Sequence, residues 1–445
     1  MEDRIYNVYI EILKEELVPA LGCTEPIALA YASAMARKVL GALPEKMDVY
    51  CSGNIIKNVK SVSVPNSGGL HGIEAAAVLG AVGGDPDSRL EVLQSVTDQD
   101  RALTRQLLEK KICTCHLQEG VSNLYIETRL FAGEHSASVT ICEHHTNIIR
   151  IEKDGKVLMA KQQGTKQEGT KQQKAKQQET EQQKNEQESA GADPRMLLNV
   201  ASILEFAQIV RLQDIEDTIG RQIELNMAIA REGIAHEYGT QVGRTLLQAY
   251  GDKSVGNRAK AMAAAGSDAR MNGCPMPVVV NSGSGNQGIT CSVPVIVYAE
   301  EWKKSKEDLY RALVVSNLVS IHQKKYIGSL SAFCDAVSAG CGAGAGIAWL
   351  YDKDYDLVCR TITNTIGNVS GVVCDGAKSS CAAKIASAVD AAIMGFTLAS
   401  RSQSFQPGDG VVKKDVEDTI KGIGYIGREG MKDTDVKILH MMIDS

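Results

Sequence analysis

A polar segment built from five-residue units divides this chain into two parts. Residues 161–189 read KQQGT, KQEGT, KQQKA, KQQET, EQQKN and EQES. A period of five matches neither the 3.6-residue period of a packed helix nor the two-residue period of a strand. Because the segment contains no large apolar residue, we interpret it as a solvated linker or a frayed polar helix. A specific interaction segment is the alternative. The core must therefore be built from the flanking parts.

The two flanking parts differ in their secondary-structure patterns. The first part predicts helices over 2–17, 26–40, 72–82 and 87–111 and extended segments over 47–51, 60–64, 122–130, 136–142 and 147–151. The second part is dominated by Ala, Leu, Ile and Met in helical patterns, interrupted by glycines at 281–288 and 340–346. We predict an α+β fold class, with an α+β domain over 1–155, a polar low-complexity linker over 156–195 and a mainly helical domain over 196–445.

Composition and charge restrict the class of protein. A chain of 445 residues is long enough for two or three domains, and its net charge of −6 provides no basic surface for nucleic acid or an anionic membrane. The N-terminus lacks the apolar stretch of a signal peptide, and the longest uncharged run, Ala336 to Tyr351, is too short to span a membrane. We expect a cytoplasmic protein that binds a small molecule. The sequence allows a homodimer without determining the oligomeric state.

Twelve cysteines are the unusual feature of the composition. In a reducing cytoplasm thiols stay free, so clustered cysteines indicate metal or redox chemistry before disulfides. Cys334 and Cys341 are seven residues apart, as are Cys374 and Cys381, which differs from the short Cys-x-x-Cys spacing of zinc sites. An iron–sulfur cluster is compatible with thiolates from separated loops. Thiols packed in the core are the alternative, and residues 113–116, CTCH, form only a weak metal candidate.

The sequence Leu21-Gly22-Cys23-Thr24-Glu25-Pro26 precedes a predicted helix. Thr24 is the expected N-cap, and proline fits the first helical turn. Unpaired amides at a helix start favour a thiolate, so we predict that Cys23 ionises near neutral pH. A small buried thiol beside the cap is the alternative.

Two glycine-rich regions are candidates for binding an anion. In the first, Ser52–Asn58 and Val64–Gly69 lead to Gly72 and a helix, which predicts backbone amides facing a carboxylate, with Lys57 as the charge partner. In the second, Asn281–Gly288 interleaves polar side chains with glycines. No Lys-Ser/Thr pair follows, so a nucleotide P-loop is excluded. Plain turns or helix caps are the alternative in both places.

Five motifs occur together in a fixed order. They are GCTEP at 22–26, SGNIIKN at 52–58 with VPNSGG at 64–69, SGSGNQGIT at 282–290, HQKKYIGSLSAFC at 322–334 and CDGAKSSCAAK at 374–384. Together they resemble the L-cysteine desulfidase family, which is related to the alpha chain of iron–sulfur L-serine dehydratases. The resemblance covers nearly the whole chain except the segment of five-residue units, which looks like an insertion.

The resemblance implies elimination without pyridoxal phosphate, using a four-iron four-sulfur (4Fe-4S) cluster. By motif position the cluster ligands are Cys334, Cys374 and Cys381, which leaves one iron open as a Lewis acid. Cys23 resembles the base that removes the α-proton. The products are pyruvate and ammonia, with hydrogen sulfide when the substrate is L-cysteine instead of L-serine. We therefore expect the three ligand thiols to converge on a cavity near Cys23.

Other motif positions are expected to bind the substrate. They are Asn54, Lys57, Asn58, Gly68, Ser284, Gly285, Asn286 and Gln287. The chain departs from the family pattern at Gly53, where proline is expected, at Ser67, where threonine is expected, and at Asp335-Ala336, where Gly-Cys is expected. Because of the last departure, Cys341 is the alternative third ligand. Cys291 is interpreted as a packed thiol.

Two other functions are weighed against this one. A pyridoxal-phosphate-dependent β-eliminating lyase would use SGSGNQG as a phosphate cup and Lys57, Lys324 or Lys378 for a Schiff base, but none of these lysines has a recognisable context. A non-catalytic amino-acid or metal sensor on the same fold is the second alternative. The presence of both Cys23 and the pair Cys374 and Cys381 argues against lost activity.

Overall fold

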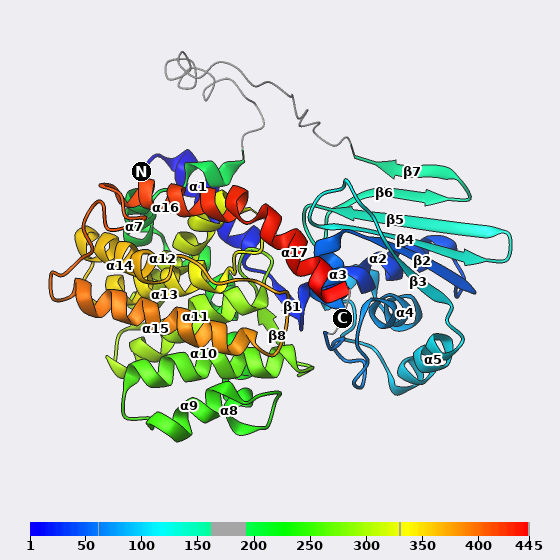
Figure 1. Ribbon diagram of the computed structural model, residues 1–445, viewed down its shortest axis with the longest axis horizontal. Helices are drawn as coiled ribbons and strands as arrows, with labels where there is room; N and C mark the ends of the chain where they lie inside the picture. Colours follow the sequence, from blue (N-terminus) through cyan, green and yellow to red (C-terminus); the bar gives the residue numbers. More distant parts are fainter. Residues whose placement is uncertain (61, 162–192, 329–330, 444–445) are drawn as a thin grey trace, which may run out of the picture.

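A computed structural model describes residues 1–60, 62–161, 193–328 and 331–443. These residues form two units that lie side by side, one containing nearly all the strands and one helical (Figure 1). The predicted α+β class with a helical C-terminal part is confirmed. The predicted linker or frayed helix at 161–189 lies, apart from Lys161, outside the described residues.

The sheet unit contains a six-stranded sheet in the order β3-β2-β4-β5-β6-β7. Its strands are β2 (Lys46–Cys51), β3 (Cys113–Leu117), β4 (Tyr125–Ala132), β5 (His135–Cys142), β6 (Ile148–Lys153) and β7 (Lys156–Ala160). Only the pair β2 and β3 is parallel, and the other neighbours are antiparallel. Strand β7 lies inside the predicted linker, because Lys156–Ala160 pairs with β6 before the polar segment begins.

Helices cover one face of this sheet. They are α2 (Thr24–Leu40), α4 (Ile73–Gly83) and α5 (Asp98–Glu109), with the short α3 (Gly53–Val59) at the end of β2. Alternation along β4 directs Ile126 and Leu130 into the shared core, where they are fully buried. The predicted polar helix over 87–111 is two elements, η1 (Pro86–Glu91) and α5, because Thr97 forms a capping box with Asp100 and starts a new helix.

The helical unit contains a bundle around α13 (Ala336–Tyr351). The other elements are η2 (Pro194–Leu197), α7 (Val200–Ile209), α8 (Leu212–Ala235), α9 (Val242–Tyr250), α10 (Val255–Met271), α11 (Gly285–Glu301), α12 (Lys306–Ile327), α14 (Tyr355–Asn368), α15 (Cys381–Ala399), α16 (Val416–Tyr425) and η3 (Ile426–Gly430). Small residues let the helices approach closely: a Cβ added at Gly340 would lie 2.9 Å from the carbonyl oxygen of Ala388. This packing fits the low aromatic content.

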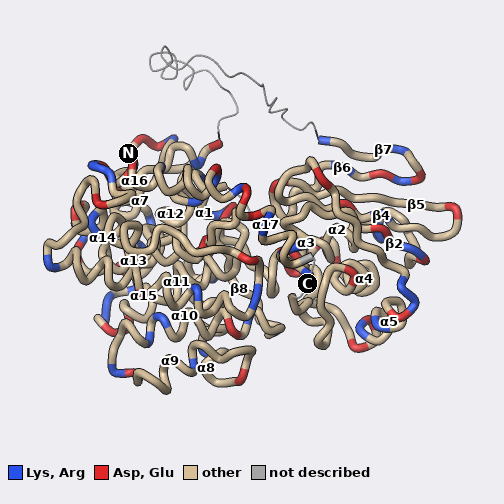
Figure 2. Tube along the Cα trace, viewed as in Figure 1, with Lys and Arg blue, Asp and Glu red and all other residues tan. Residues whose placement is uncertain are grey.

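Among the described helices, α15 is long and apolar enough to cross a membrane by length and composition alone. Half of its most apolar stretch is buried inside the protein. It packs against α10, α13 and α14, as the core helix of a bundle does. In the view of Figure 2, Lys and Arg residues are interspersed with Asp and Glu over both units.

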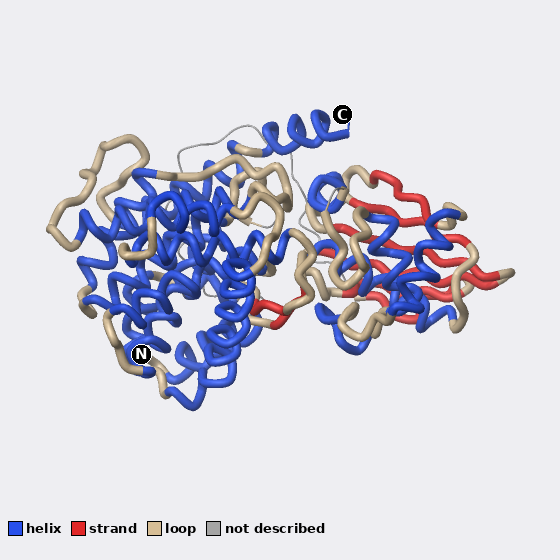
Figure 3. The backbone as a smooth tube through the Cα atoms, turned by 90° about the horizontal axis from the view of Figure 1, so that it is seen from below, coloured by secondary structure: helices blue, strands red, loops and turns tan. Residues whose placement is uncertain are grey.

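The two ends of the chain connect the units. Helix α1 (Asp3–Glu16), which the sequence placed in the first domain, buries Tyr9 and Leu13 in the core of the helical unit. Strand β1 (Pro19–Leu21) then pairs antiparallel with β8 (Pro277–Val279) at the junction, as the small strand pair in Figure 3 shows. The last helix, α17 (Lys432–Ile443), packs against α3 of the sheet unit. The chain therefore crosses the junction repeatedly, and this crossing builds the site described next.

Candidate active site

A cavity of about 580 Å³ lies between the two units. Nine of the residues predicted from the motifs line it: Cys23, Lys57, Asn58, Ser284, Asn286, Gln287, Cys334, Cys374 and Cys381. These residues come from α2 and α3 on one side and from α11, α15 and the loops around them on the other. The structure thus brings together the proposed base, the proposed ligands and most of the proposed binding residues.

A tight turn places Cys23 at the start of α2. Gly22 has a positive φ of 56°, and a Cβ at this position would lie 2.9 Å from Cβ of Pro65, so only glycine fits. This contact joins the GCTEP and VPNSGG motifs. Cys23 is the N-cap residue, so the prediction of Thr24 as the cap is wrong by one position. The Thr24 hydroxyl instead donates to Glu25 Oε2 at 3.1 Å.

Glu25 is the hydrogen-bond partner of Cys23. The thiol donates to Glu25 Oε2 at 3.1 Å, and Asn58 Nδ2 donates to Glu25 Oε1 at 3.2 Å. Burial and the negative charge of Glu25 raise the pKa of Cys23 well above its ordinary value, so the predicted thiolate at neutral pH is wrong for this arrangement. Burial alone would raise the pKa of Glu25, but the charge of His145 and the bond from Cys23 lower it. The pair is therefore a thiol beside a carboxylate.

Two loops of the helical unit place two of the candidate ligand thiols side by side. Cys334 N–H donates to the carbonyl of Val372 and Cys374 N–H donates to that of Ala332, both at 2.7 Å. A hydrogen bond between the two thiols lowers the pKa of Cys374 to about 7 and raises that of Cys334. Both side chains face the cavity, so one of the two sulfurs is predisposed to ionise.

The third candidate ligand, Cys381, begins α15. Its sulfur accepts from the backbone N–H of Lys378 at 3.4 Å, and it packs beside Cys23 in a small cluster with Met271. Burial raises the pKa of Cys381. A Cβ at Gly376, whose φ is 93°, would lie 2.8 Å from Asn58 Oδ1, so the last motif also contacts the second.

Two cavity lysines have carboxylate partners. Lys57, buried in α3, pairs with Asp435 of α17, and Lys324 Nζ lies 2.6 Å from Asp335 Oδ2. Gln287 Nε2 also donates to Asp335 Oδ2, at 3.3 Å. Asp335 is one of the residues that depart from the family pattern, and the structure gives it a role as the counter-ion of Lys324. The predicted charge partner of a substrate carboxylate, Lys57, is therefore already neutralised.

Several polar atoms around the cavity are buried without a hydrogen-bond partner. Two of them, Lys324 Nζ and Asp335 Oδ1, belong to the ion pair described above, and the others are Asn58 Oδ1, His145 Nε2, Arg270 Nε, Asn286 Oδ1 and Gln287 Oε1. Most buried polar atoms in proteins are paired, so the five atoms outside that ion pair indicate a site for a polar ligand. Sequence reasoning missed three residues here: Glu25, His145 and Arg270. Glu25 stands inside GCTEP, whereas the other two belong to none of the motifs.

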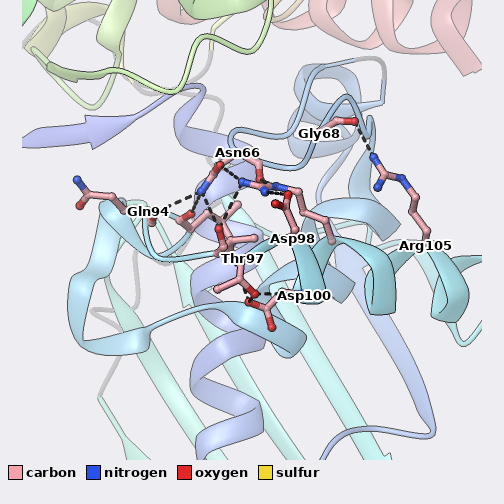
Figure 4. Close-up of polar contacts among 10 residues, drawn as sticks. Asn66, Gly68, Gln94, Thr97, Asp98, Asp100 and Arg105 are labelled. Atoms are coloured by element: carbon pink, nitrogen blue, oxygen red, sulfur yellow. Dashed lines mark hydrogen bonds and ion pairs between the residues drawn. The ribbon is translucent and has the colours of Figure 1, made fainter.

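Three predicted binding residues do not line this cavity. Asn54 lines a neighbouring cavity of about 590 Å³ beneath α17. Gly285 supports the wall, since a Cβ there would lie 2.7 Å from Arg270 Cζ. Gly68 lies in a loop fastened to α5, where its carbonyl accepts from Arg105 Nη2 at 2.8 Å (Figure 4).

The remaining cysteine candidates lie away from the cavity. Cys341 is fully buried in α13, and its thiol donates to the carbonyl of Ile362 at 3.9 Å, so the alternative third ligand is not at the site. Cys291 is packed in the core as expected, and its thiol donates to the carbonyl of Ala339 at 3.8 Å. Cys113 and Cys115 lie in β3, and Cys113 is buried.

Comparisons with known proteins show the family of this chain. A family model described as serine dehydratase alpha chain matches residues 87–440, so the chain belongs to the serine dehydratase alpha-chain family. Family membership indicates a serine dehydratase-like lyase. The chain is 48% identical over 443 residues to a UPF0597 protein of Desulfitobacterium hafniense, covering 100% of this chain and 98% of the relative.

Further relatives cover the same length. A UPF0597 protein of Lachnoclostridium phytofermentans is 49% identical over 440 residues, which is 99% of this chain and 100% of the relative. One of Finegoldia magna is 47% identical over 437 residues, which is 98% of this chain and 99% of the relative. The likeness therefore extends over both units and the cavity between them.

Proposed function

We propose that the protein catalyses the β-elimination of L-cysteine or L-serine without pyridoxal phosphate, with a 4Fe-4S cluster held by Cys334, Cys374 and Cys381. The observation that carries this proposal is that one cavity is lined by these three thiols together with Cys23 and the polar loop 282–287 at the start of α11. The products are pyruvate and ammonia, with hydrogen sulfide from L-cysteine.

The donor set fits an iron–sulfur cluster better than a single metal ion. Among the described residues, no group of three or more His, Cys, Asp or Glu side chains is close enough to hold one ion. The ligands of a four-iron cluster bind different irons and can come from separate segments, as Cys334 and Cys374 in two loops and Cys381 at the start of α15 do. All three donors are thiols, and the side chains of Lys384 and Arg270 contribute positive charge near them. When bound, the cluster supplies a Lewis-acidic iron that assists departure of the leaving group.

The chain's own residues provide the proton transfers. Glu25 Oε2 accepts the thiol proton of Cys23, with which it already forms a hydrogen bond, while the sulfur removes the α-proton of the substrate, so that no free thiolate has to form first. The electron pair of the C–H bond forms the double bond of aminoacrylate as hydrosulfide or hydroxide leaves from the β-carbon, and solvent protonates the leaving group to hydrogen sulfide or water. Water then hydrolyses the imine form of this product to pyruvate and ammonia. Asn58 orients Glu25 during the transfer.

The contacts of two of the three candidate lysines, Lys57 and Lys324, argue against a pyridoxal-phosphate enzyme. A Schiff-base lysine needs a neutral amine, whereas Lys57 and Lys324 each form an ion pair with an aspartate. Keeping all twelve cysteines as free thiols requires a reducing compartment, so we also propose a cytoplasmic location.

Anaerobic purification tests the proposed function. We expect a broad absorbance that air bleaches, iron and sulfide in the protein, and release of pyruvate from L-cysteine or L-serine. An aldimine absorbance near 400 nm that borohydride removes would favour the pyridoxal-phosphate alternative. Iron-containing protein that binds these amino acids but releases no pyruvate would favour the sensor.

A further inference from the structure

The cavity contains a buried arginine that has no carboxylate partner. Arg270 lies at the end of α10 with 4% of its surface exposed. It forms no ion pair with any described residue, its Nε has no hydrogen-bond partner, and its Nη1 contacts only the thioether sulfur of Met271, at 3.5 Å. Burying an unpaired guanidinium is energetically unfavourable, so its retention here indicates a partner that the chain itself does not supply.

The other cations around the cavity differ from Arg270. Lys57 is paired with Asp435, Lys324 with Asp335, and Arg195 with Glu16. These three side chains are neutralised within the fold, so they offer little net attraction to an anion. Lys325 has no ion pair, but its Nζ donates to the carbonyl of Leu198 at 2.6 Å. Glu25 lies near enough for the charge of Arg270 to lower its pKa, but the two do not form an ion pair. Among the described cations that line the cavity, Arg270 has neither a carboxylate partner nor a bond to a backbone carbonyl.

The surrounding loop is shaped to accommodate this side chain. A Cβ at Gly285 would lie 2.7 Å from Arg270 Cζ, so glycine at this position lets the guanidinium lie against the backbone of the SGSGNQG loop. The neighbouring Asn286 donates to the same Met271 sulfur at 3.4 Å and keeps its Oδ1 unpaired. Met271 also packs against Cys23. The arginine is thus held beside both the binding loop and the proposed base.

We propose that Arg270 binds the α-carboxylate of the amino-acid substrate, with Asn286 beside it contacting the polar groups of the same molecule. This inference rests on the proposed function and replaces the expectation that Lys57 is the charge partner. The planar guanidinium offers parallel N–H donors that match the two oxygens of a carboxylate. Such a contact fixes the α-carbon near Cys23, so Arg270 is a specificity and positioning residue for the elimination.

Binding of an unreactive amino acid tests the role of Arg270 directly. L-Alanine has no β-leaving group, and L-alaninamide lacks only the carboxylate charge. By titration calorimetry on the anaerobically purified full chain, we expect L-alaninamide to bind at least about 30-fold more weakly than L-alanine. We expect Arg270→Gln to weaken L-alanine binding by about 100-fold, to the level of the amide, and to leave amide binding nearly unchanged. Arg270→Lys keeps the positive charge but lacks the parallel N–H donors of the guanidinium, so we expect L-alanine binding to weaken by an intermediate factor of about 10.

Arg195→Gln is the matched control, because it removes a cavity arginine that already has carboxylate partners; it should keep the preference for L-alanine. If Arg270→Gln does not fold, Gly285→Ala serves instead, since it displaces the guanidinium while retaining arginine; the same loss of preference is expected. Equal binding of acid and amide by the wild type would overturn the inference. So would a wild-type preference retained in Arg270→Gln.

A parallel pyruvate assay separates this inference from the proposed function. If the wild type releases no pyruvate but the preference for L-alanine depends on Arg270, the elimination is wrong and the carboxylate site stands. If pyruvate is released and the preference survives in Arg270→Gln, the elimination stands and the role of Arg270 is wrong.

Discussion

Two glycine-rich loops that look alike in sequence have different surroundings in the structure. In the loop Val64–Gly69, the Asn66 side chain donates to the carbonyl of Leu93 at 2.8 Å and accepts from Arg101 Nη2 at 2.6 Å (Figure 4). In the loop Asn281–Gly288, Asn286 Oδ1 and Gln287 Oε1 face the cavity without a partner. The glycine pattern is shared, but only the second loop has unused polar groups beside an unpaired charge. Unsatisfied polar atoms, more than glycines, thus mark the binding loop.

The cysteines also differ in whether they line the cavity or pack in the core, and replacing one that lines the cavity gives the largest expected loss of activity. Cys374 lines the cavity, whereas Cys341 is packed in α13. We expect Cys374→Ala to lose cluster iron and to reduce pyruvate formation to background, because a ligand is removed. Cys341→Ala should keep both. Iron analysis with a pyruvate assay on anaerobic protein measures this, and full activity of an iron-free Cys374→Ala protein would end the cluster hypothesis.

Exchanging the asparagines of the two loops sharpens the comparison. Asn286→Ala removes an atom that is unpaired until substrate binds, so we expect kcat/KM to fall about 10-fold or more with little change in the free energy of unfolding. Asn66→Ala removes hydrogen bonds of the fold, so we expect about 2 kcal/mol of destabilisation in urea with kcat/KM nearly unchanged. The reverse outcome would show that the loops were assigned the wrong way round.

The smallest expected effect is a change in the pH dependence of the free energy of unfolding, caused by a residue outside the cavity. Asp268 of α10 is buried, accepts from the N–H of Gly243 at 3.0 Å, and has its pKa raised by burial from 3.8 to about 6. The folded state therefore holds a proton that the unfolded state releases between about pH 4 and pH 6, so stability falls as pH rises through this window. The full loss, present above pH 6, is about 3 kcal/mol.

Asp268→Asn should remove this pH-dependent component. Urea unfolding at pH 4.5 and 7 compares the two proteins, with turnover at pH 7 as the check that the cavity is intact. A variant with the wild-type dependence on pH would show that Asp268 is ionised in both states throughout.

The sequence predicted the parts of the site that are local and missed those that depend on distant contacts. The motifs identified Cys23, Cys374 and the α11 loop because each is a short run of chemically distinctive residues. The partner of Lys57 is Asp435, 378 residues away, and no local pattern reveals that pair. Arg270 follows an Ala-rich stretch and belongs to no motif, although an arginine directly after the run AMAAAGSDA is a signal that could have been followed.

In the fold, too, the sequence predicted the local features and missed those that depend on distant contacts. The α+β class and most helices follow from hydrophobic periodicity, which is a local property. The position of α1 in the helical core is set by contacts with residues about 200 positions later, such as the hydrogen bond from Tyr6 to Asp214 at 2.6 Å. Strand β7 was missed because the polar segment that follows it dominated the composition. Predicting either element requires the tertiary contacts themselves.

Turnover by the Cys23→Ala protein tests the central claim most directly. The claim is that the Cys23 thiol, beside Glu25 in the cavity, removes the α-proton while three other thiols hold the cluster. With iron content equal to that of the wild type, we expect pyruvate formation from L-cysteine and L-serine to fall by about 1,000-fold or more. Normal turnover by an iron-loaded Cys23→Ala protein would contradict the account.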